Sequence, residues 1–412
     1  MPRRQLLPTV LAHTIGVGNP TISPLAIANV LEVLRSNRLT YGPFSRRFEQ
    51  EFSAMHGADF GIFCNSGTSA LQVALDAIRI SRRLTDGDEV LVPALTFVAT
   101  INTALHNRLK PVLVDVDPDY YLLDPEKIEA RITSRTRAII PVHAFGQPAD
   151  MARIAPIAER HDLSVIEDSA EAVLVRTSGR AVGSWGNVAC FSTYAAHHLS
   201  TGVGGLATTS DPSLAQLIRS LVNHGRDTAY TSIDDDDVED RDTLAEVVSR
   251  RFLYHHIGYS YRATELEAAL GCAALEELPE IVRGHQSAAA RLSAALAPLE
   301  SEGLVQLPRE RDGTEHSYMM YPIVVAAHVD VGTLISHLEC SGIETRPMLP
   351  ILQQPAYANV WTQDEIDGCP VAESLGARGF YIGCHDGMTE EAVLRVAQIL
   401  EDQTWRSMAS GG

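Results

Sequence analysis

A cluster of glycine and hydroxyl residues stands directly before a helical pattern early in the chain. The segment NSGTSALQVAL, residues 65–75, places Gly67 and Thr68 at the start of that predicted helix. Backbone N–H groups at a helix N-terminus can hold a phosphate, because the helix dipole favours negative charge there. The same residues also suit an ordinary helix N-cap, so this segment alone leaves both interpretations open.

Two further segments end predicted strands with side chains suited to an aromatic ligand. In PALTFVATINTAL, residues 93–105, Phe97 follows an apolar run and is either a stacking partner for a flat heteroaromatic ring or a core residue. In VIEDSAEAV, residues 165–173, a strand runs straight into Glu167 and Asp168. A buried carboxylate needs a partner, and a protonated pyridine nitrogen would serve, as would a Ser, Thr or Arg side chain.

A fourth segment brings a hydroxyl and two adjacent histidines to a glycine turn. In CFSTYAAHHLSTGVGGLATT, residues 190–209, a predicted strand is followed by Ser192, His197 and His198. A histidine with a pKa near its reference value of about 6.5 is suited to general acid and base work at neutral pH.

The elements that must position these residues follow an α/β pattern. Short apolar runs alternate with helical stretches from Asp88 to Gly205, which indicates a mainly parallel sheet covered on both faces. Ligands of such sheets bind at the carboxyl ends of the strands. We predict a large domain over residues 1–270, then a connecting helix interrupted at Pro279 and a small C-terminal α/β domain within 271–412. The aspartate-rich stretch 230–246 is predicted to be a solvated loop.

Composition excludes several classes of function. The chain has 412 residues, 45% of them apolar, and this length exceeds what one hydrophobic core usually supports. Its net charge of −19 argues against nucleic acid or an anionic membrane as a partner. The six cysteines show no metal-like spacing. We find neither a signal-peptide pattern nor an apolar run of about 18 residues. These features favour a cytoplasmic protein with a small-molecule substrate.

Taken in order, the four segments resemble the DegT/DnrJ/StrS family of nucleotide-sugar aminotransferases. RLTYGPFSRRFEQEF, HIGYSYRATELEAALG and GIETRPMLPILQQPAY extend the resemblance over residues 15–400. It implies the fold type I architecture of pyridoxal-phosphate enzymes and a homodimer in which each subunit completes the other's site. It also implies a phosphate site at Gly67, Thr68 and Ser192, a stacking role for Phe97, and an Asp168 that keeps the pyridine nitrogen protonated.

His197 stands where the family pattern S-F-x-x-x-K-x-x-x-x-G-E-G-G has the lysine that binds the cofactor covalently. Imidazole cannot form that bond stably, so the resemblance implies pyridoxal or pyridoxamine phosphate held non-covalently. Histidine here is characteristic of the family's sugar 3-dehydratases. In those enzymes pyridoxamine phosphate condenses with a 4-keto-6-deoxy sugar nucleotide, and the histidine removes the cofactor's C4′ proton, driving loss of the C3 hydroxyl.

One type of these dehydratases carries an iron–sulfur cluster, with most of its cysteines in the loop that follows a motif seen here as NHGRD, residues 223–227. That loop has no cysteine in this chain, so no iron–sulfur cluster is expected. The chain therefore resembles the cluster-free GDP-4-keto-6-deoxymannose 3-dehydratase type, which regenerates pyridoxamine phosphate with glutamate.

Several residues depart from the family pattern or leave their role open. Glu171 replaces a Gln and Ser260 replaces an Asn that reaches the neighbouring subunit's phosphate; both are predicted to bind cofactor. His198, His256 and Arg346 are predicted to bind substrate. The alternatives are a structural role for His198, a solvated loop for His256 and a surface ion pair for Arg346.

We predict a dehydratase, a lyase acting on a nucleotide-linked keto-deoxysugar, with His197 as general base. The alternatives are an aminotransferase that operates without the lysine, a catalytically inactive homologue, and a different elimination on a non-sugar metabolite.

Overall fold

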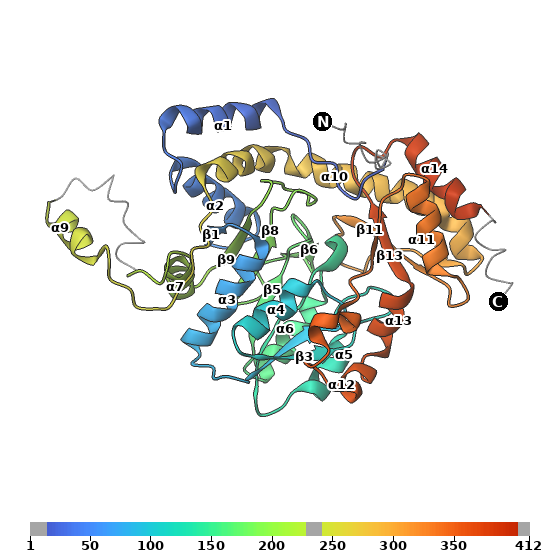
Figure 1. The fold of residues 1–412 in the computed structure, drawn as a ribbon, viewed down its shortest axis with the longest axis horizontal. Helices are drawn as coiled ribbons and strands as arrows, with labels where there is room; N and C mark the ends of the chain where they lie inside the picture. Colours follow the sequence, from blue (N-terminus) through green and yellow to red (C-terminus); the bar gives the residue numbers. More distant parts are fainter. Residues whose placement is uncertain (1–14, 228–240, 403–412) are drawn as a thin grey trace, which may run out of the picture.

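The computed structural model describes residues 15–227 and 241–402, in which two large sheets are joined by one long helix and β6 (Arg176–Thr177) and β7 (Arg180–Ala181) form a small third sheet (Figure 1). The larger sheet has seven strands, parallel from β8 to β3 and antiparallel where β9 joins β8 and β1. This confirms the mainly parallel sheet expected from the sequence. In spatial order the strands are β1 (Phe60–Cys64), β9 (Gly205–Thr209), β8 (Val188–Ser192), β5 (Ser164–Asp168), β4 (Thr136–Ile139), β2 (Glu89–Pro93) and β3 (Lys110–Val114).

Helix α3 (Gly67–Ser81) is the central helix of the large domain. Its residues are buried almost continuously from Gly67 to Ile78, because it packs on β8, β9 and β5 and between two further helices. Burial on nearly every side explains why most of its residues are apolar, although Ser69, Gln72 and Asp76 are buried with them. The other helices of this domain are α2 (Pro43–Met55), α4 (Val98–His106), α5 (Pro125–Ile128), α6 (Met151–Arg160) and α7 (Pro212–Val222).

The connecting helix α10 (Glu265–Ser301) runs without a break through Pro279, so the predicted interruption there is wrong. Thr264 and Glu267 form a capping box that fixes its start. A helical proline removes one backbone hydrogen bond, and the burial of Leu275, Leu278 and Val282 around Pro279 holds the helix together across this gap. Helix α10 packs on α2 in the large domain and on α14 (Glu390–Glu401) in the small one, while α1 (Pro24–Ser36) lies along it.

The small domain is a four-stranded sheet covered by helices, and its predicted strand–helix–strand–helix pattern is confirmed. Its strands lie in the order β10 (Val305–Gln306), β11 (Met320–Val325), β13 (Gly379–Gly383) and β12 (Thr345–Pro347). The helices are α11 (Val331–Cys340), α12 (Gln363–Asp367), α13 (Pro370–Arg378) and α14. The predicted domain limit at residue 270 falls in the second turn of α10.

The loop predicted for the acidic stretch 230–246 is contradicted at its C-terminal end. Residues 228–240 lie outside the described part of the chain, but Arg241–Arg250 form helix α9, so the predicted loop is wrong from residue 241 on. Asp242 in the first turn and Arg250 in the last complement the helix dipole. Among the described residues, no helix combines the length and the apolar character needed to cross a bilayer.

Candidate active site

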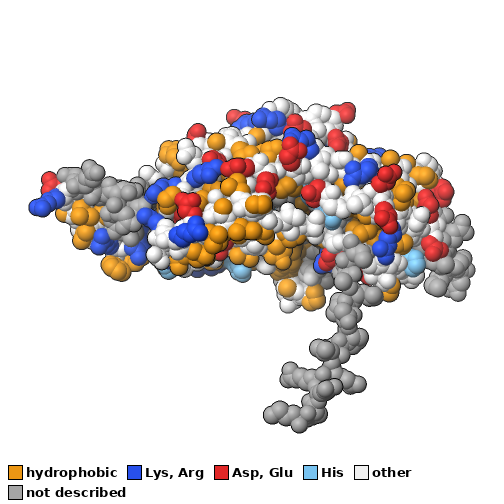
Figure 2. Space-filling model, turned by 90° about the horizontal axis from the view of Figure 1, so that it is seen from above, with side chains coloured by type: hydrophobic (Ala, Val, Ile, Leu, Met, Phe, Trp, Pro, Cys, Tyr) orange, Lys and Arg blue, Asp and Glu red, His pale blue; other side chains and the backbone are white. Residues whose placement is uncertain are grey.

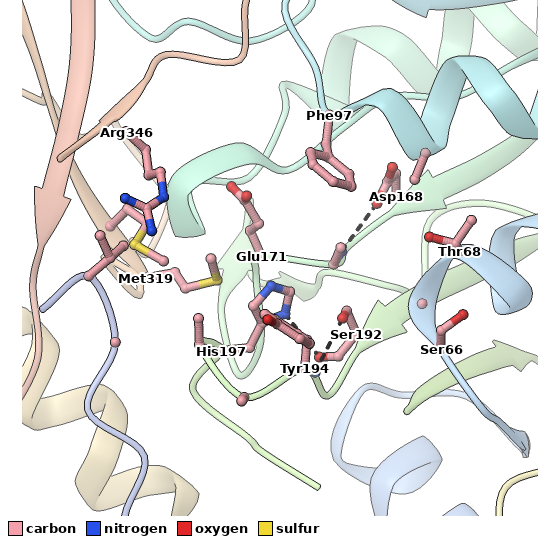
Figure 3. Close-up of a pocket in the computed structure, with 18 of the residues that line it drawn as sticks. Ser66, Thr68, Phe97, Asp168, Glu171, Ser192, Tyr194, His197, Met319 and Arg346 are labelled. Carbon is pink, nitrogen blue, oxygen red and sulfur yellow. Dashed lines mark hydrogen bonds between the residues drawn. The ribbon is translucent and has the colours of Figure 1, made fainter. Parts of the chain in front are cut away.

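A cavity of about 630 Å³ lies between the carboxyl edge of the large sheet and the small domain. The four chemistry-bearing segments meet here, each at the end of a strand or the start of a helix (Figure 3). Predicted site residues in its wall are Gly67, Thr68, Phe97, Asp168, Glu171, Ser192, His197 and Arg346.

The N-terminus of α3 and the end of β8 form a tight cradle on one side of the cavity. Ser66 caps α3 by accepting a hydrogen bond from the Ser69 N–H at 3.0 Å. A Cβ at Gly67 would lie 2.7 Å from the Ser192 Cβ, so only glycine lets the helix start approach β8 this closely. Thr68 is exposed and lines the same wall. Amide groups at a helix N-terminus beside two hydroxyls are well suited to a phosphate.

Phe97 and Asp168 suit a cationic aromatic ring. Phe97, the N-cap of α4, is 58% exposed although it is aromatic, because one side of its ring faces the cavity. Asp168 ends β5, is 4% exposed and accepts a hydrogen bond from Thr100 Oγ1 at 2.8 Å. Burial raises its pKa, and the Thr100 hydrogen bond opposes this only in part. A protonated ring nitrogen would supply the positive partner that a buried carboxylate needs.

His197 lies in the loop between β8 and β9 with its ring at the cavity wall (Figure 3). Its Nδ1 is 3.3 Å from the Ser192 carbonyl oxygen, and the Ala170 carbonyl also lies beside the ring, so in the neutral imidazole one ring nitrogen carries the hydrogen and the other keeps its lone pair. Burial lowers the pKa of His197 to about 4. The ring is therefore neutral at neutral pH, and its unprotonated nitrogen can accept a proton.

No lysine is available in this site. Lys110 and Lys127 are the only lysines in the sequence. Lys110 opens β3 and pairs with Glu365 at 3.0 Å, Lys127 belongs to α5, and neither lines the cavity. No lysine of the cavity wall can therefore attach an aldehyde cofactor covalently.

Glu171 and Arg346 belong to the wall nearer the small domain. Glu171 accepts a hydrogen bond from the Phe145 N–H at 2.6 Å, and burial raises its pKa to about 7. Arg346, in β12, donates to the Thr345 carbonyl at 2.8 Å and forms an ion pair with Glu344. Its charge is therefore partly compensated before any substrate binds.

Three predicted residues are not brought into this cavity. His198 is 5% exposed, its Nε2 lies 2.9 Å from the Ser317 carbonyl, and its ring packs on His285 at 4.4 Å. A substrate-binding role for His198 does not fit this position in the core. His256 and Ser260 lie in the segment after α9 and away from the cavity wall of this protomer, so their roles stay predictions.

Sequence reasoning missed several residues of the wall. Tyr194 is 55% exposed and its ring centroid lies 6.2 Å from that of His197. Its place three residues before His197 was the signal that could have identified it. Met319 and Tyr381 come from the small domain.

Buried neutral histidines make the stability of the protein sensitive to acid. Burial lowers the pKa of His56 and His285 to about 4 and that of His316 to about 3. An unfolded histidine titrates near 6.5, so between about pH 6.5 and 4 the unfolded chain binds protons that the folded chain does not. The free energy of unfolding therefore falls as pH falls through this window, by about 2 kcal/mol per buried histidine between pH 6.5 and 5.

We expect urea denaturation to show this loss of unfolding free energy on acidification. Glu171 opposes it only in part: because its pKa is raised in the folded state, its contribution to stability increases as pH falls. The slope should diminish in a His56→Gln variant. An unfolding free energy that rises on acidification from pH 6.5 to 5 would contradict the account.

The fold and this cavity define a pyridoxal-phosphate-dependent enzyme class with the aminotransferase architecture. The chain belongs to the DegT/DnrJ/EryC1/StrS aminotransferase family, whose model matches residues 20–401. It is a family of pyridoxal-phosphate-dependent enzymes that act on nucleotide sugars.

Relatives within the family carry out more than one reaction. A GDP-perosamine synthase of Caulobacter vibrioides is 35% identical over 94% of this chain and 97% of its own length. A dTDP-4-dehydro-2,6-dideoxy-D-glucose 3-dehydratase of Saccharopolyspora spinosa is 32% identical over 90% of this chain and 83% of its own length. Among solved structures, an E. coli GDP-4-keto-6-deoxy-D-mannose-3-dehydratase with bound hydrated pyridoxal phosphate has a TM-score of 0.83, covering 95% of this chain and 100% of that one. Its 22% identity makes this a likeness of fold alone.

Proposed function

We propose that the protein removes the C3 hydroxyl of a nucleotide-linked 4-keto-6-deoxy sugar as water, with His197 as the base. The observation that carries this proposal is that the wall of the cavity, in a chain of this family, contains a neutral histidine and no lysine. The relationship to a sugar 3-dehydratase at 32% identity supports it.

The cofactor we propose is pyridoxamine phosphate, bound without a covalent link and regenerated from pyridoxal phosphate by glutamate. When bound, it supplies an amine that condenses with the keto group and a ring that accepts electrons. The helix start at Gly67 and Thr68, with Ser192, holds the phosphate, and Phe97 covers one ring face. Asp168 keeps the ring nitrogen protonated. His197 would accept a proton at its unprotonated ring nitrogen, and the contact of Nδ1 with the Ser192 carbonyl helps to orient the ring.

Transamination without the lysine is the competing function, and the higher identity to a perosamine synthase favours it. The two reactions differ in the fate of the amino nitrogen. Dehydration leaves the ketone in the product, so nitrogen taken from glutamate must be released as ammonia. Transamination keeps that nitrogen in the sugar.

This difference tests the proposal directly. Purified protein is incubated with pyridoxal phosphate, glutamate labelled with heavy nitrogen and a panel of 4-keto-6-deoxy sugar nucleotides. We expect the label in free ammonia, in step with formation of a deoxygenated sugar. Label in an amino sugar would establish transamination instead, and no consumption of glutamate with any sugar would favour an inactive homologue.

We further propose that the protein works as a homodimer. Ile257 is 97% exposed and Phe252 is 81% exposed, an unusual position for such large apolar side chains. Their segment, which also holds Ser260 and His256, runs beside the phosphate cradle, where the Asn65 N–H donates to the Tyr261 carbonyl at 2.7 Å. A second subunit covering this segment would bury the apolar side chains close to the cavity.

A charge at Ile257 should therefore break the dimer. We expect Ile257→Glu to raise the dimer dissociation constant by at least roughly 10²-fold, since an unpaired charge in an interface costs about 3 kcal/mol or more. Sedimentation of wild type and variant over a range of concentrations measures this. Leu394→Glu is the matched control, because Leu394 is also exposed, at 51%, but belongs to α14. Figure 2 shows the face of the molecule over α1 and α10, where exposed apolar side chains are interspersed with charged ones. A wild-type monomer at micromolar concentration would contradict the proposal.

A further inference from the structure

Loss of a hydroxyl as water needs a proton donor as well as a base. Hydroxide is a poor leaving group, so a positioned acid that protonates the departing oxygen accelerates such a step, typically by 10²–10⁴-fold. His197 is neutral and accepts a proton. A second group that already holds a proton would be better suited to give one.

Glu171 has the position that such a donor requires. It sits in the cavity wall, three residues after Asp168, and Figure 3 shows its carboxyl directed into the space between Phe97 and Arg346. One carboxyl oxygen, Oε2, is held by the Phe145 N–H at 2.6 Å. Because an oxygen that accepts this bond is the poorer site for a proton, the proton belongs on Oε1.

The groups around Glu171 favour its protonated form. Burial is the largest cause of its raised pKa of about 7, and the negative charge of Asp168 adds to it. From the small domain, Tyr381 and Arg346 line the same cavity. The Arg346 charge would favour the carboxylate, but the ion pair with Glu344 counteracts it. His197, from the loop after β8, is neutral and adds no charge.

The residue type is itself informative. The resemblance implies Gln here in many family members; its amide oxygen can accept the Phe145 hydrogen bond, but an amide is not an acid. A carboxyl in its place costs burial of an ionisable group, so it is best explained by a function that an amide cannot perform.

We propose that Glu171 is the general acid that protonates the departing C3 oxygen of the substrate. This role rests on the proposed dehydration. His197 would take a proton from a carbon of the amine cofactor; the electron pair of that C–H bond shifts toward C3 of the bound sugar, and the C3–O bond breaks with its electrons on oxygen. Glu171 gives its proton to that oxygen, which leaves as water. One proton is gained and one lost by the protein, so exchange with solvent restores both groups. The two electrons that reduce C3 come from the amine cofactor, which glutamate regenerates.

The acid and the base define the pH dependence. His197 must be unprotonated, above about pH 4, and Glu171 protonated, below about pH 7. We expect kcat/KM for dehydration to fall about tenfold per pH unit well above pH 7.

A Glu171→Gln variant tests the role with two substrates. For the natural C3 hydroxyl we expect kcat to fall by roughly 10²–10³-fold and the alkaline limb of the pH profile to disappear. For a 3-chloro-3-deoxy analogue, whose chloride leaves without a proton, the variant should match wild type. Exposed Glu391, in the first turn of α14, provides the control variant Glu391→Gln.

Infrared difference spectra of the protein without cofactor provide a readout independent of turnover. We expect a protonated-carboxyl band in wild type and Glu391→Gln that titrates near pH 7 and is missing in Glu171→Gln. Absence of this band would overturn the proposal. If wild type deoxygenates the sugar and Glu171→Gln does so at the same rate, the role of Glu171 fails while the function stands. If wild type deoxygenates no sugar, the proposed function fails as well.

Discussion

Replacing His197 by alanine should lower the rate of C3 deoxygenation by roughly 10²–10⁴-fold, the contribution typical of a positioned base. The carboxyl groups of the cavity wall are less suited to this role, because burial raises the pKa of Glu171 to about 7, Glu344 pairs with Arg346, and we propose that Asp168 pairs with the ring nitrogen. Single-turnover rates with pyridoxamine phosphate and a 4-keto-6-deoxy sugar nucleotide measure the effect. Cofactor affinity, measured by titration, should change little, because the phosphate and ring contacts come from other residues.

Two further variants define the role of His197. His328→Ala removes an exposed histidine from the turn after β11 and should leave the rate unchanged. His197→Lys restores the family's amine, so borohydride reduction should link pyridoxal phosphate to that residue, while deoxygenation is lost. Full turnover by His197→Ala would refute the role of His197 as the base.

Replacing Asp168 by asparagine should have the next largest effect. Asparagine keeps the shape and a partner for the Thr100 hydroxyl, which lies 2.8 Å from Asp168, but removes the negative charge. Without that charge a buried ring nitrogen loses its proton, and the ring accepts electrons poorly. Removing one partner of a buried ion pair costs about 3–5 kcal/mol, so we expect the deoxygenation rate to fall by roughly 10²-fold or more.

The asparagine variant should also bind the cofactor more weakly, with a changed absorption spectrum that reports the unprotonated ring. Asp364→Asn, at an exposed position in α12, controls for loss of a carboxylate. If Asp168→Asn shows wild-type affinity and turnover, Asp168 does not pair with the ring.

The part of the site built by the large domain could be predicted from sequence, because parallel strands end at one edge of their sheet. This rule alone predicts that Phe97, Asp168 and Ser192 meet, and the structure confirms that they line one cavity. The wall from the small domain could not be predicted in the same way. Tyr381 lines the cavity because of the way the two domains pack, and the local sequence around β13 does not indicate that packing.

Local rules failed where tertiary packing outweighed them. Pro279 predicts a helix break, yet α10 continues through it because the neighbouring side chains pack in the core. His198 follows His197 directly in the sequence, but its side chain is buried in the core, where Nε2 contacts the Ser317 carbonyl. The roles predicted for Ser260 and His256 depend on a second subunit, which the fold of a single chain does not contain. β1 was not anticipated, although FGIFC is an apolar run directly before the phosphate segment.

The structure of the sugar product tests the central claim most directly. Wild-type protein, pyridoxal phosphate, glutamate and a 4-keto-6-deoxy sugar nucleotide are combined, and the product is characterised by NMR. The account predicts a methylene group at C3 with the C4 ketone retained. A product that keeps its C3 hydroxyl and carries an amine at C4 would contradict the account and make this protein an aminotransferase that works without a lysine.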